Sequence, residues 1–286
     1  MFFRPIGAVV VAVAFSFVTA TAAFAAPDNG TGGTSANWAG YAVSGQSYNF
    51  VTATWVEPAM PVPCVFGSSG PSLGSFRTGF DGYGNGTSEQ VGTLIECIPN
   101  GPPSGATTPM VVKHAGFYQM VPGSPGFGVV FCNPEPPTTT KGCTGSFALK
   151  AGDRVTATAS YANGTFTFGL YNHRTHQSAT ATAASTAPRT SAEAVVETPV
   201  PAPLTDFGKV TFQHFAAHTS DSSDEQGNHE GDNPTAGDNA GDNADQNDGE
   251  NGHSKPVAIT MKAGTVVRAE PSHLHDGDFT VSWQHA

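Results

Sequence analysis

Charged residues are scarce in this chain, and basic ones are scarcer than acidic ones. Only 12% of the 286 residues are charged, and Lys and Arg number 12 against 23 Asp and Glu. A nucleic-acid binder needs a basic surface to displace counterions, so this balance argues against that class. The low charged fraction argues against a coiled coil, and 34 Gly with 22 Pro disfavour a helical bundle. The length still suffices for a domain with a buried core.

Several familiar catalytic and metal-binding motifs are also missing. The sequence has no Gly-x-Ser-x-Gly, no His-Glu-x-x-His and no pair of Asp-Thr/Ser-Gly motifs. The ten His residues are scattered, and His273 with His275 is too small a set for a metal site. We therefore expect no metal and no other cofactor.

The N-terminus has the features of an export signal. Arg4 precedes the apolar run 6–18, and Ala23-Phe24-Ala25 has the small-residue spacing of a cleavage site. This predicts a signal peptide over 1–25 and a flexible leader over 26–34. An N-terminal membrane anchor is the alternative, although the run is short for a bilayer span. We expect a secreted protein that is free of the membrane once the signal is removed.

The cysteines number only four: Cys64, Cys97, Cys132 and Cys143. An even number in an exported chain suggests two disulfides. Cys132 and Cys143 flank a stretch rich in Pro, Thr and Gly, so they are the preferred pair, which leaves Cys64 with Cys97. Three connectivities remain possible from the sequence. Zinc binding is the alternative, but no Cys-x-x-Cys spacing supports it.

From residue 35 onward the sequence reads as many short strands, which predicts an all-β antiparallel sandwich or barrel. The dipeptide Asn163-Gly164 favours a tight turn because both central residues of a type I′ turn need positive φ. The expected strands cover residues 51–56, 111–121, 127–131, 154–161, 165–171, 192–197, 209–215, 257–268 and 279–283.

Residues 219–254 interrupt this pattern with Asp, Asn, Gly, Ser and Gln, and 221–250 contain ten of the acidic residues. A segment so poor in apolar residues cannot offset the entropy of ordering. We expect a disordered acidic loop inserted into a single domain that spans 35–286. Calcium binding by the clustered carboxylates is the alternative, but the spacing fits neither an EF-hand nor a β-roll repeat.

Separate stretches of the chain, taken in order, resemble the glutamic peptidases, or eqolisins. The resemblance rests on residues 35–41, 51–58, 79–82, 89–92, 192–197, 206–212 and 279–283. It implies a β-sandwich of two bent antiparallel sheets, similar to concanavalin-like lectins. It also implies an acid-active, pepstatin-insensitive endopeptidase with a Gln/Glu dyad in a cleft on one sheet. By motif position the dyad is Gln90 and Glu193. We expect a monomer that acts on polypeptide substrates.

The chemistry of this pair suits peptide hydrolysis. A carboxylate at Glu193 can take a proton from water and return it to the leaving amine, and the Gln90 amide can donate to the oxyanion. An ordinary Glu titrates near ~4.3, which predicts activity at acidic pH with a loss where Glu193 becomes protonated. Strand parity places Glu193 and Glu197 on one face, about 13 Å apart, too far to share a proton. Glu197 is the rival candidate for the catalytic acid.

The resemblance places substrate-binding residues around the dyad and also reveals departures from the family pattern. The expected substrate-binding residues are Trp38, Asp81, Phe117 and Gln119, and Trp55 is expected in the core. Arg77-Thr78 stands where the family has Trp-Val, and Gln119 replaces a Glu. Phe117 and Ala194 each stand where the family has Trp. These departures leave two alternatives open, an inactive relative that serves as a lectin-like binding module and a surface protein that displays the acidic loop.

Overall fold

The structure, a computed structural model, describes residues 33–60, 64, 72–99, 109–122, 128–136, 143–198, 203–219 and 255–285. Within these ranges the chain forms strands, turns and loops without any helix, so none of the described segments is a helix able to cross a membrane. The predicted signal peptide and nearly all of the predicted acidic loop lie outside the described residues.

The strands confirm the all-β prediction. Their bounds are β1 Gly33–Ser35, β2 Trp38–Ser44, β3 Tyr48–Val56, β4 Ser72–Phe80, β5 Ser88–Pro99, β6 Met110–Val121, β7 Val129–Val130, β8 Arg154–Ala162, β9 Thr165–Asn172, β10 Gln177–Ala184, β11 Ser191–Glu197, β12 Lys209–Thr219, β13 Val257–Ala263, β14 Val266–Pro271 and β15 Phe279–Trp283.

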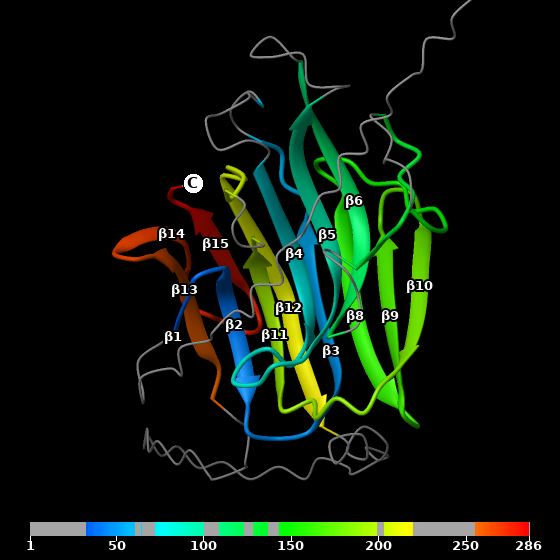
Figure 1. Ribbon diagram of the computed structural model, residues 1–286, viewed down its shortest axis with the longest axis vertical. Helices are drawn as coiled ribbons and strands as arrows, with labels where there is room; N and C mark the ends of the chain where they lie inside the picture. The colour runs from blue at the N-terminus through cyan, green and yellow to red at the C-terminus, as the bar shows by residue number, and fades with distance from the viewer. Residues whose placement is uncertain are drawn as a thin grey trace, which may run out of the picture.

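The strands form two antiparallel layers that one hairpin joins. Hydrogen bonding follows the order β10-β9-β8-β3-β12-β15-β14-β13-β2-β11-β4-β5-β6-β7, and β1 adds to β13 in parallel. The chain of strands folds over at the β13–β14 hairpin, which brings β4 against β3 and β8, and β5 against β8 and β9. In Figure 1 the two layers overlap, and β10 and β14 lie at opposite sides of the view. The expected sandwich is confirmed.

The space between the layers is filled mainly by aromatic and aliphatic side chains. On β9 the Phe residues face inward while the intervening Thr residues are more exposed, as the alternation predicts. Trp55 is fully buried in the main core, also as expected, and its ring lies 5.6 Å from that of Phe212. Asn163 and Gly164 have φ angles of 51° and 78°, which confirms the tight turn between β8 and β9.

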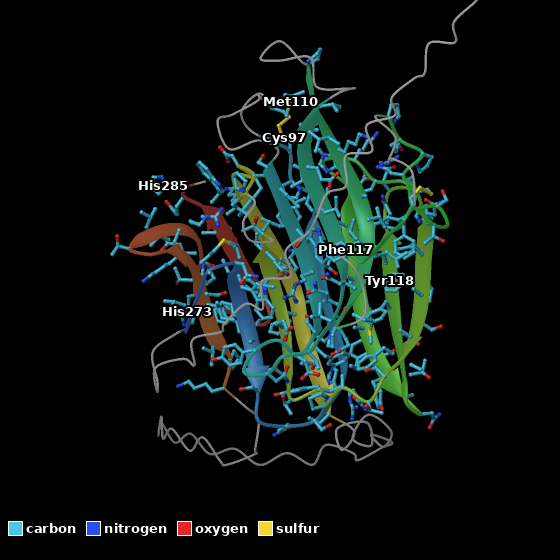
Figure 2. All side chains as sticks on the ribbon, viewed as in Figure 1. Cys97, Met110, Phe117, Tyr118, His273 and His285 are labelled. Atoms are coloured by element: carbon cyan, nitrogen blue, oxygen red, sulfur yellow. A yellow bond between two sulfur atoms is a disulfide. The ribbon has the colours of Figure 1, made fainter. Side chains whose placement is uncertain are left out.

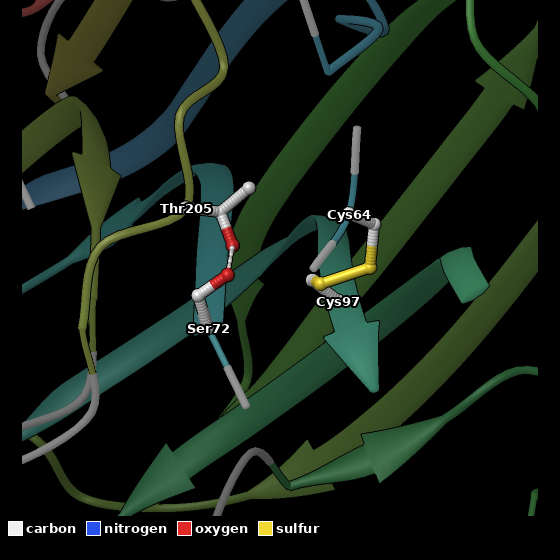
Figure 3. The surroundings of a disulfide bond; sticks show 4 residues. All are labelled: Cys64, Ser72, Cys97 and Thr205. Atoms are coloured by element: carbon white, nitrogen blue, oxygen red, sulfur yellow. Dashed lines mark hydrogen bonds between the residues drawn. A yellow bond between two sulfur atoms is a disulfide. The ribbon is translucent and has the colours of Figure 1, made fainter. Parts of the chain in front are cut away.

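Both preferred disulfides are present. Cys132 bonds to Cys143, and Cys64 bonds to Cys97 near the end of β5. Cys97 lies opposite Ser72 in the β4–β5 ladder. Figure 3 shows this region, where the Thr205 hydroxyl donates to the Ser72 hydroxyl at 2.9 Å. The Cys64 disulfide therefore ties the segment before β4 to the end of β5.

Some predicted strand boundaries need correction. The run expected over 257–268 is two strands, because the chain turns at Gly264 with φ of 61°. The strand expected over 127–131 shrinks to Val129–Val130, preceded by Gly128 with φ of 77°. β1 begins at Gly33, inside the predicted leader, and β12 extends to Thr219, the first residue of the predicted insertion.

Candidate active site

The candidate dyad lies on one face of the layer that contains β2, β11, β4, β5 and β6. Successive residues of a strand point to opposite faces, and Phe117 and Tyr118 of β6, labelled in Figure 2, are one such pair. Tyr118 packs against the main core between the layers, whereas Phe117 packs in a separate cluster with Leu94 and Ala115. We call the face that carries Phe117 the site face.

Gln90 and Glu193 belong to one row of residues across the site face. Glu193 of β11 pairs with Gly79 of β4, and Gly79 pairs with Gln90 of β5. The row continues to Gln119 of β6. Residues directly opposite each other in a ladder point to the same face, so the fold brings together the two residues that the motifs single out.

Gly79 separates the two side chains without filling the space between them. A Cβ atom at Gly79 would lie 2.5 Å from the Glu89 carbonyl oxygen and 2.8 Å from the Gln90 Cα. No larger residue fits while β4 and β5 keep this spacing. Two strand spacings put the Gln90 and Glu193 backbones roughly 9–10 Å apart, with only bare backbone between them.

The Gln90 amide is held by two neighbours. Its Nε2 donates to Gln119 Oε1, and the Ser88 hydroxyl donates to Gln90 Oε1 at 3.3 Å. An amide NH₂ has two hydrogens, so Nε2 has a second hydrogen beyond the one directed at Gln119. Gln119, which stands where the family pattern has Glu, therefore accepts a hydrogen bond from the Gln90 amide and so orients it.

Glu193 is fully buried, which favours its neutral form. Its Oε1 accepts from Arg77 Nη1 at 3.4 Å, and its Oε2 accepts from the Ser191 hydroxyl at 3.5 Å. Loss of hydration raises the pKa of Glu193 to about 8, with Asp81 and Glu197 adding to the rise and Arg77 opposing it. The sequence predicted an ordinary Glu that is ionised at mildly acidic pH, and this expectation is wrong for the free protein.

The exposure of the dyad also differs from the expectation of an open cleft. Glu193 is 0% exposed and Gln90 only 3%. Water and a peptide must reach Glu193 in any reaction that it catalyses. In the free protein both side chains are buried.

Arg77 is the charged residue at the centre of the site face. Its Nε donates to Glu197 Oε2 at 2.5 Å, and its guanidinium carbon lies 4.2 Å from the centroid of the Trp38 ring. The side chain is fully buried, and its Nη2 atom has no hydrogen-bond partner among the described residues. Sequence reasoning noted Arg77 as a departure but missed that it contacts both glutamates.

Asp81 is buried at the end of β4 and is engaged by the chain itself. Its carboxylate accepts from the backbone amides of Arg189 and Thr190, both at 2.7 Å, and from Asn85 Nδ2. These bonds fix the segment that leads into β11 and so place Glu193. Glu89, which the sequence did not single out, lies beside Asp81, and burial raises its pKa to about 9. A neutral Glu89 therefore faces the Asp81 carboxylate.

The other predicted substrate-binding residues share the site face. Trp38 pairs with Glu197, and Phe117 lies across from Gly92, one row from Gln119. The fold thus gathers Trp38, Phe117 and Gln119 around the dyad and leaves Asp81 at the edge. Their roles toward substrate remain predictions.

Gln90 and Glu193 stand in one cross-strand row on either side of Gly79, and the described residues of that row include no Ser or Cys. Residues 36–237 match the model of the Peptidase A4 family. The chain belongs to this family, which confirms the resemblance to the glutamic peptidases and the predicted enzyme class, a glutamic endopeptidase.

The comparison with solved structures agrees on the fold. Scytalido-glutamic peptidase bound to a peptide-based transition-state analogue is 14% identical, with a TM-score of 0.54 over 87% of this chain and 98% of that one. A second structure of that enzyme, with a transition-state analogue inhibitor, gives 15% identity and a TM-score of 0.52 over the same shares. No curated protein matches the chain.

Proposed function

We propose that this chain is a secreted, acid-active endopeptidase that hydrolyses polypeptides with Gln90 and Glu193. The observation that carries the proposal is the register across Gly79, which sets these two side chains on the same face in a member of the Peptidase A4 family. Trp38, Phe117 and Gln119 would line the bound peptide.

The proposed reaction needs only one carboxylate and one amide. The Glu193 carboxylate accepts a proton from water as the water oxygen bonds to the scissile carbonyl carbon. The Gln90 N–H donates to the oxygen that becomes negative. When the tetrahedral intermediate collapses, the C–N bond breaks and Glu193 gives its proton to the amine nitrogen. Glu193 is then a carboxylate again.

Acid activity demands that Glu193 ionise well below the pKa it has in the free protein. Burial holds this pKa near 8, and Arg77 is the cation in contact with the carboxyl. A nearby cation favours the carboxylate. Under this proposal Arg77 has to stabilise the charged form in the complex with substrate.

Cleavage of an unfolded protein tests the proposal. Purified protein should cleave denatured casein between pH 2 and 5 in the presence of pepstatin, and Glu193→Gln should lose the activity by at least about 100-fold. Glu270→Gln, at an exposed position of β14, is the matched control and should cleave as the wild type does. Full cleavage by Glu193→Gln would remove Glu193 from the reaction and leave Glu197 as the candidate.

Secretion has its own support and its own test. The disulfides suit an oxidising compartment outside the cytosol. N-terminal sequencing of protein from the culture medium should begin near residue 26. Protein retained in cells with an intact N-terminus would contradict export.

The burial of Glu193 favours one alternative, a catalytically inactive relative that serves as a lectin-like binding module. A buried carboxyl in contact with Arg77 is also what a purely structural role would require. This alternative predicts no cleavage at any pH together with retention on a glycan array. Cleavage that depends on Glu193 would exclude it.

A further inference from the structure

The register of β4 and β11 places Arg77 midway between two glutamates. Arg77 pairs with Val195, which separates Glu193 from Glu197 on β11. Side chains two residues apart on a strand share a face, so both carboxyls flank the guanidinium. Arg77 Nη1 lies 3.4 Å from Glu193 Oε1, and Nε lies 2.5 Å from Glu197 Oε2.

The Trp38 ring packs on the Arg77 guanidinium and holds it in this position. The Trp38 ring covers it at 4.2 Å, and Gly82 packs so closely on Trp38 that a Cβ there would lie 2.4 Å from Trp38 Cη2. Arg77 is fully buried, so its charge is poorly screened by water. One positive charge thus serves two carboxyls, and the shorter contact is with Glu197.

We propose that Arg77 is a positioning residue for the proposed peptidase reaction, and that Glu197 competes with Glu193 for its guanidinium and thereby sets the pH at which Glu193 becomes a carboxylate. This inference rests on the proposed function, and it deepens the role of the same site. Glu197, the sequence-based rival for catalysis, becomes a competing counter-ion.

The other groups that act on Glu193 are compatible with this role. Asp81 at the end of β4 adds negative charge, and Glu89 of β5 is neutral because its pKa is about 9. Gly79, Gln90 and Ala42 in the same row are uncharged. The Ser191 hydroxyl, which donates to Glu193 Oε2, does not itself titrate in this range. The ionisation of Glu193 is therefore favoured by Arg77 and opposed by Asp81 and Glu197, and of these two carboxylates Glu197 is the one bound to the guanidinium.

Two substitutions should move the ionisation of Glu193 in opposite directions. Arg77→Met removes the cation, so Glu193 should titrate at least about one pH unit higher, a tenfold change in ionised fraction. Glu197→Gln frees the guanidinium and removes a negative charge, so Glu193 should titrate at least about one unit lower. A residue that merely supports the fold would not produce opposite shifts.

The titration is best measured by ¹³C NMR of labelled glutamate carboxyls, with the Glu193 signal identified by its loss in Glu193→Gln. Glu270→Gln is the control and should not shift it. Arg77→Lys keeps the charge and should return the Glu193 titration most of the way to its wild-type position. Arg77→Gln, which is also uncharged, replaces Arg77→Met if that variant does not fold. Shifts in the same direction for Arg77→Met and Glu197→Gln, or no shift, would overturn the proposal.

The pH dependence of kcat/KM supplies the second readout. Its acid limb should move with the NMR titration, upward in Arg77→Met and downward in Glu197→Gln. An acid limb that stays fixed while the NMR titration moves would overturn the catalytic part of the inference. Absence of peptidase activity in the wild type would instead refute the proposed function, and the NMR shifts would still decide whether Arg77 is shared.

Discussion

Single buried polar residues in this protein depend on one another through short hydrogen-bonded chains. Between the layers, Trp55 Nε1 donates to Thr93 Oγ1 at 3.1 Å, and the Thr93 hydroxyl donates to Glu57 Oε2 at 2.5 Å. His114 Nδ1 lies 2.8 Å from the other Glu57 oxygen. Each member is buried or nearly so, and the loss of one removes a hydrogen bond from each of its neighbours.

Replacement of Thr93 tests this dependence. Thr93→Val keeps the shape but leaves the Trp55 N–H and a Glu57 oxygen unpaired, so the free energy of unfolding should fall by about 3 kcal/mol. Thr93→Ser keeps the hydroxyl and should cost only about 1 kcal/mol for the lost methyl group. Urea unfolding measures both. Equal losses in the two variants would show that the hydroxyl contributes nothing.

At the scale of elements, the close approach of β4 and β5 is what places the dyad. Gly79 permits that approach, because any Cβ there would meet the backbone of β5. Gly79→Ala should therefore lower the free energy of unfolding by at least about 2 kcal/mol. It should also reduce kcat/KM, since Gln90 and Glu193 are pushed apart.

Gly86→Ala is the matched control for Gly79→Ala. A Cβ at Gly86 has no atom within 4 Å, and Gly86 is not among the residues with positive φ. Its stability and activity should remain within about 0.5 kcal/mol and twofold of the wild type. If Gly79→Ala behaved as Gly86→Ala does, the bare backbone between the dyad residues would have no special role.

At the scale of the whole molecule, buried carboxyls make the protein more stable in acid than at alkaline pH. Burial raises the pKa of Glu89 to about 9 and that of Glu193 to about 8, and it also raises the pKa of Glu96. The folded state keeps these protons where the unfolded chain releases them above about pH 4.5. Stability should therefore fall as pH rises from about 5 to 9.

Thermal unfolding measured at a series of pH values tests whether stability falls as the pH rises. Tm should fall by at least about 4 °C between pH 5 and pH 9. Below about pH 4 the opposite effect enters, because Arg174 and Asn172 hold the pKa of Asp153 low and its protonation costs stability. Glu89→Gln should reduce the decrease of Tm between pH 5 and pH 9. A Tm that rises steadily from pH 5 to 9 would contradict the assignment of neutral buried carboxyls.

The sequence predicted the strands whose apolar residues alternate most clearly, such as β8 and β9. It did not predict β4, because this strand is buried on both faces and its Gly, Ser and Arg residues give no alternation of apolar and polar positions. The run 257–268, expected to be one strand, is a hairpin of two strands. Its Gly264 turn lies between two segments of equal β propensity.

The site was predictable only in part. Motif order singled out Gln90 and Glu193, and strand parity placed Glu193 and Glu197 on one face. The shared guanidinium of Arg77 and the contacts of Asp81 with Arg189 and Thr190 depend on register between strands distant in sequence. The raised pKa of Glu193 depends on burial, which a single strand pattern does not reveal.

A double-substitution cycle in kcat/KM tests most directly whether Gln90 and Glu193 act as one unit. Glu193→Gln and Gln90→Leu should each reduce kcat/KM by at least about 100-fold. Because both serve the same transition state, the double variant should be no more than several-fold worse than Glu193→Gln alone. Losses that multiply, or wild-type activity in either single variant, would contradict a dyad that meets across Gly79.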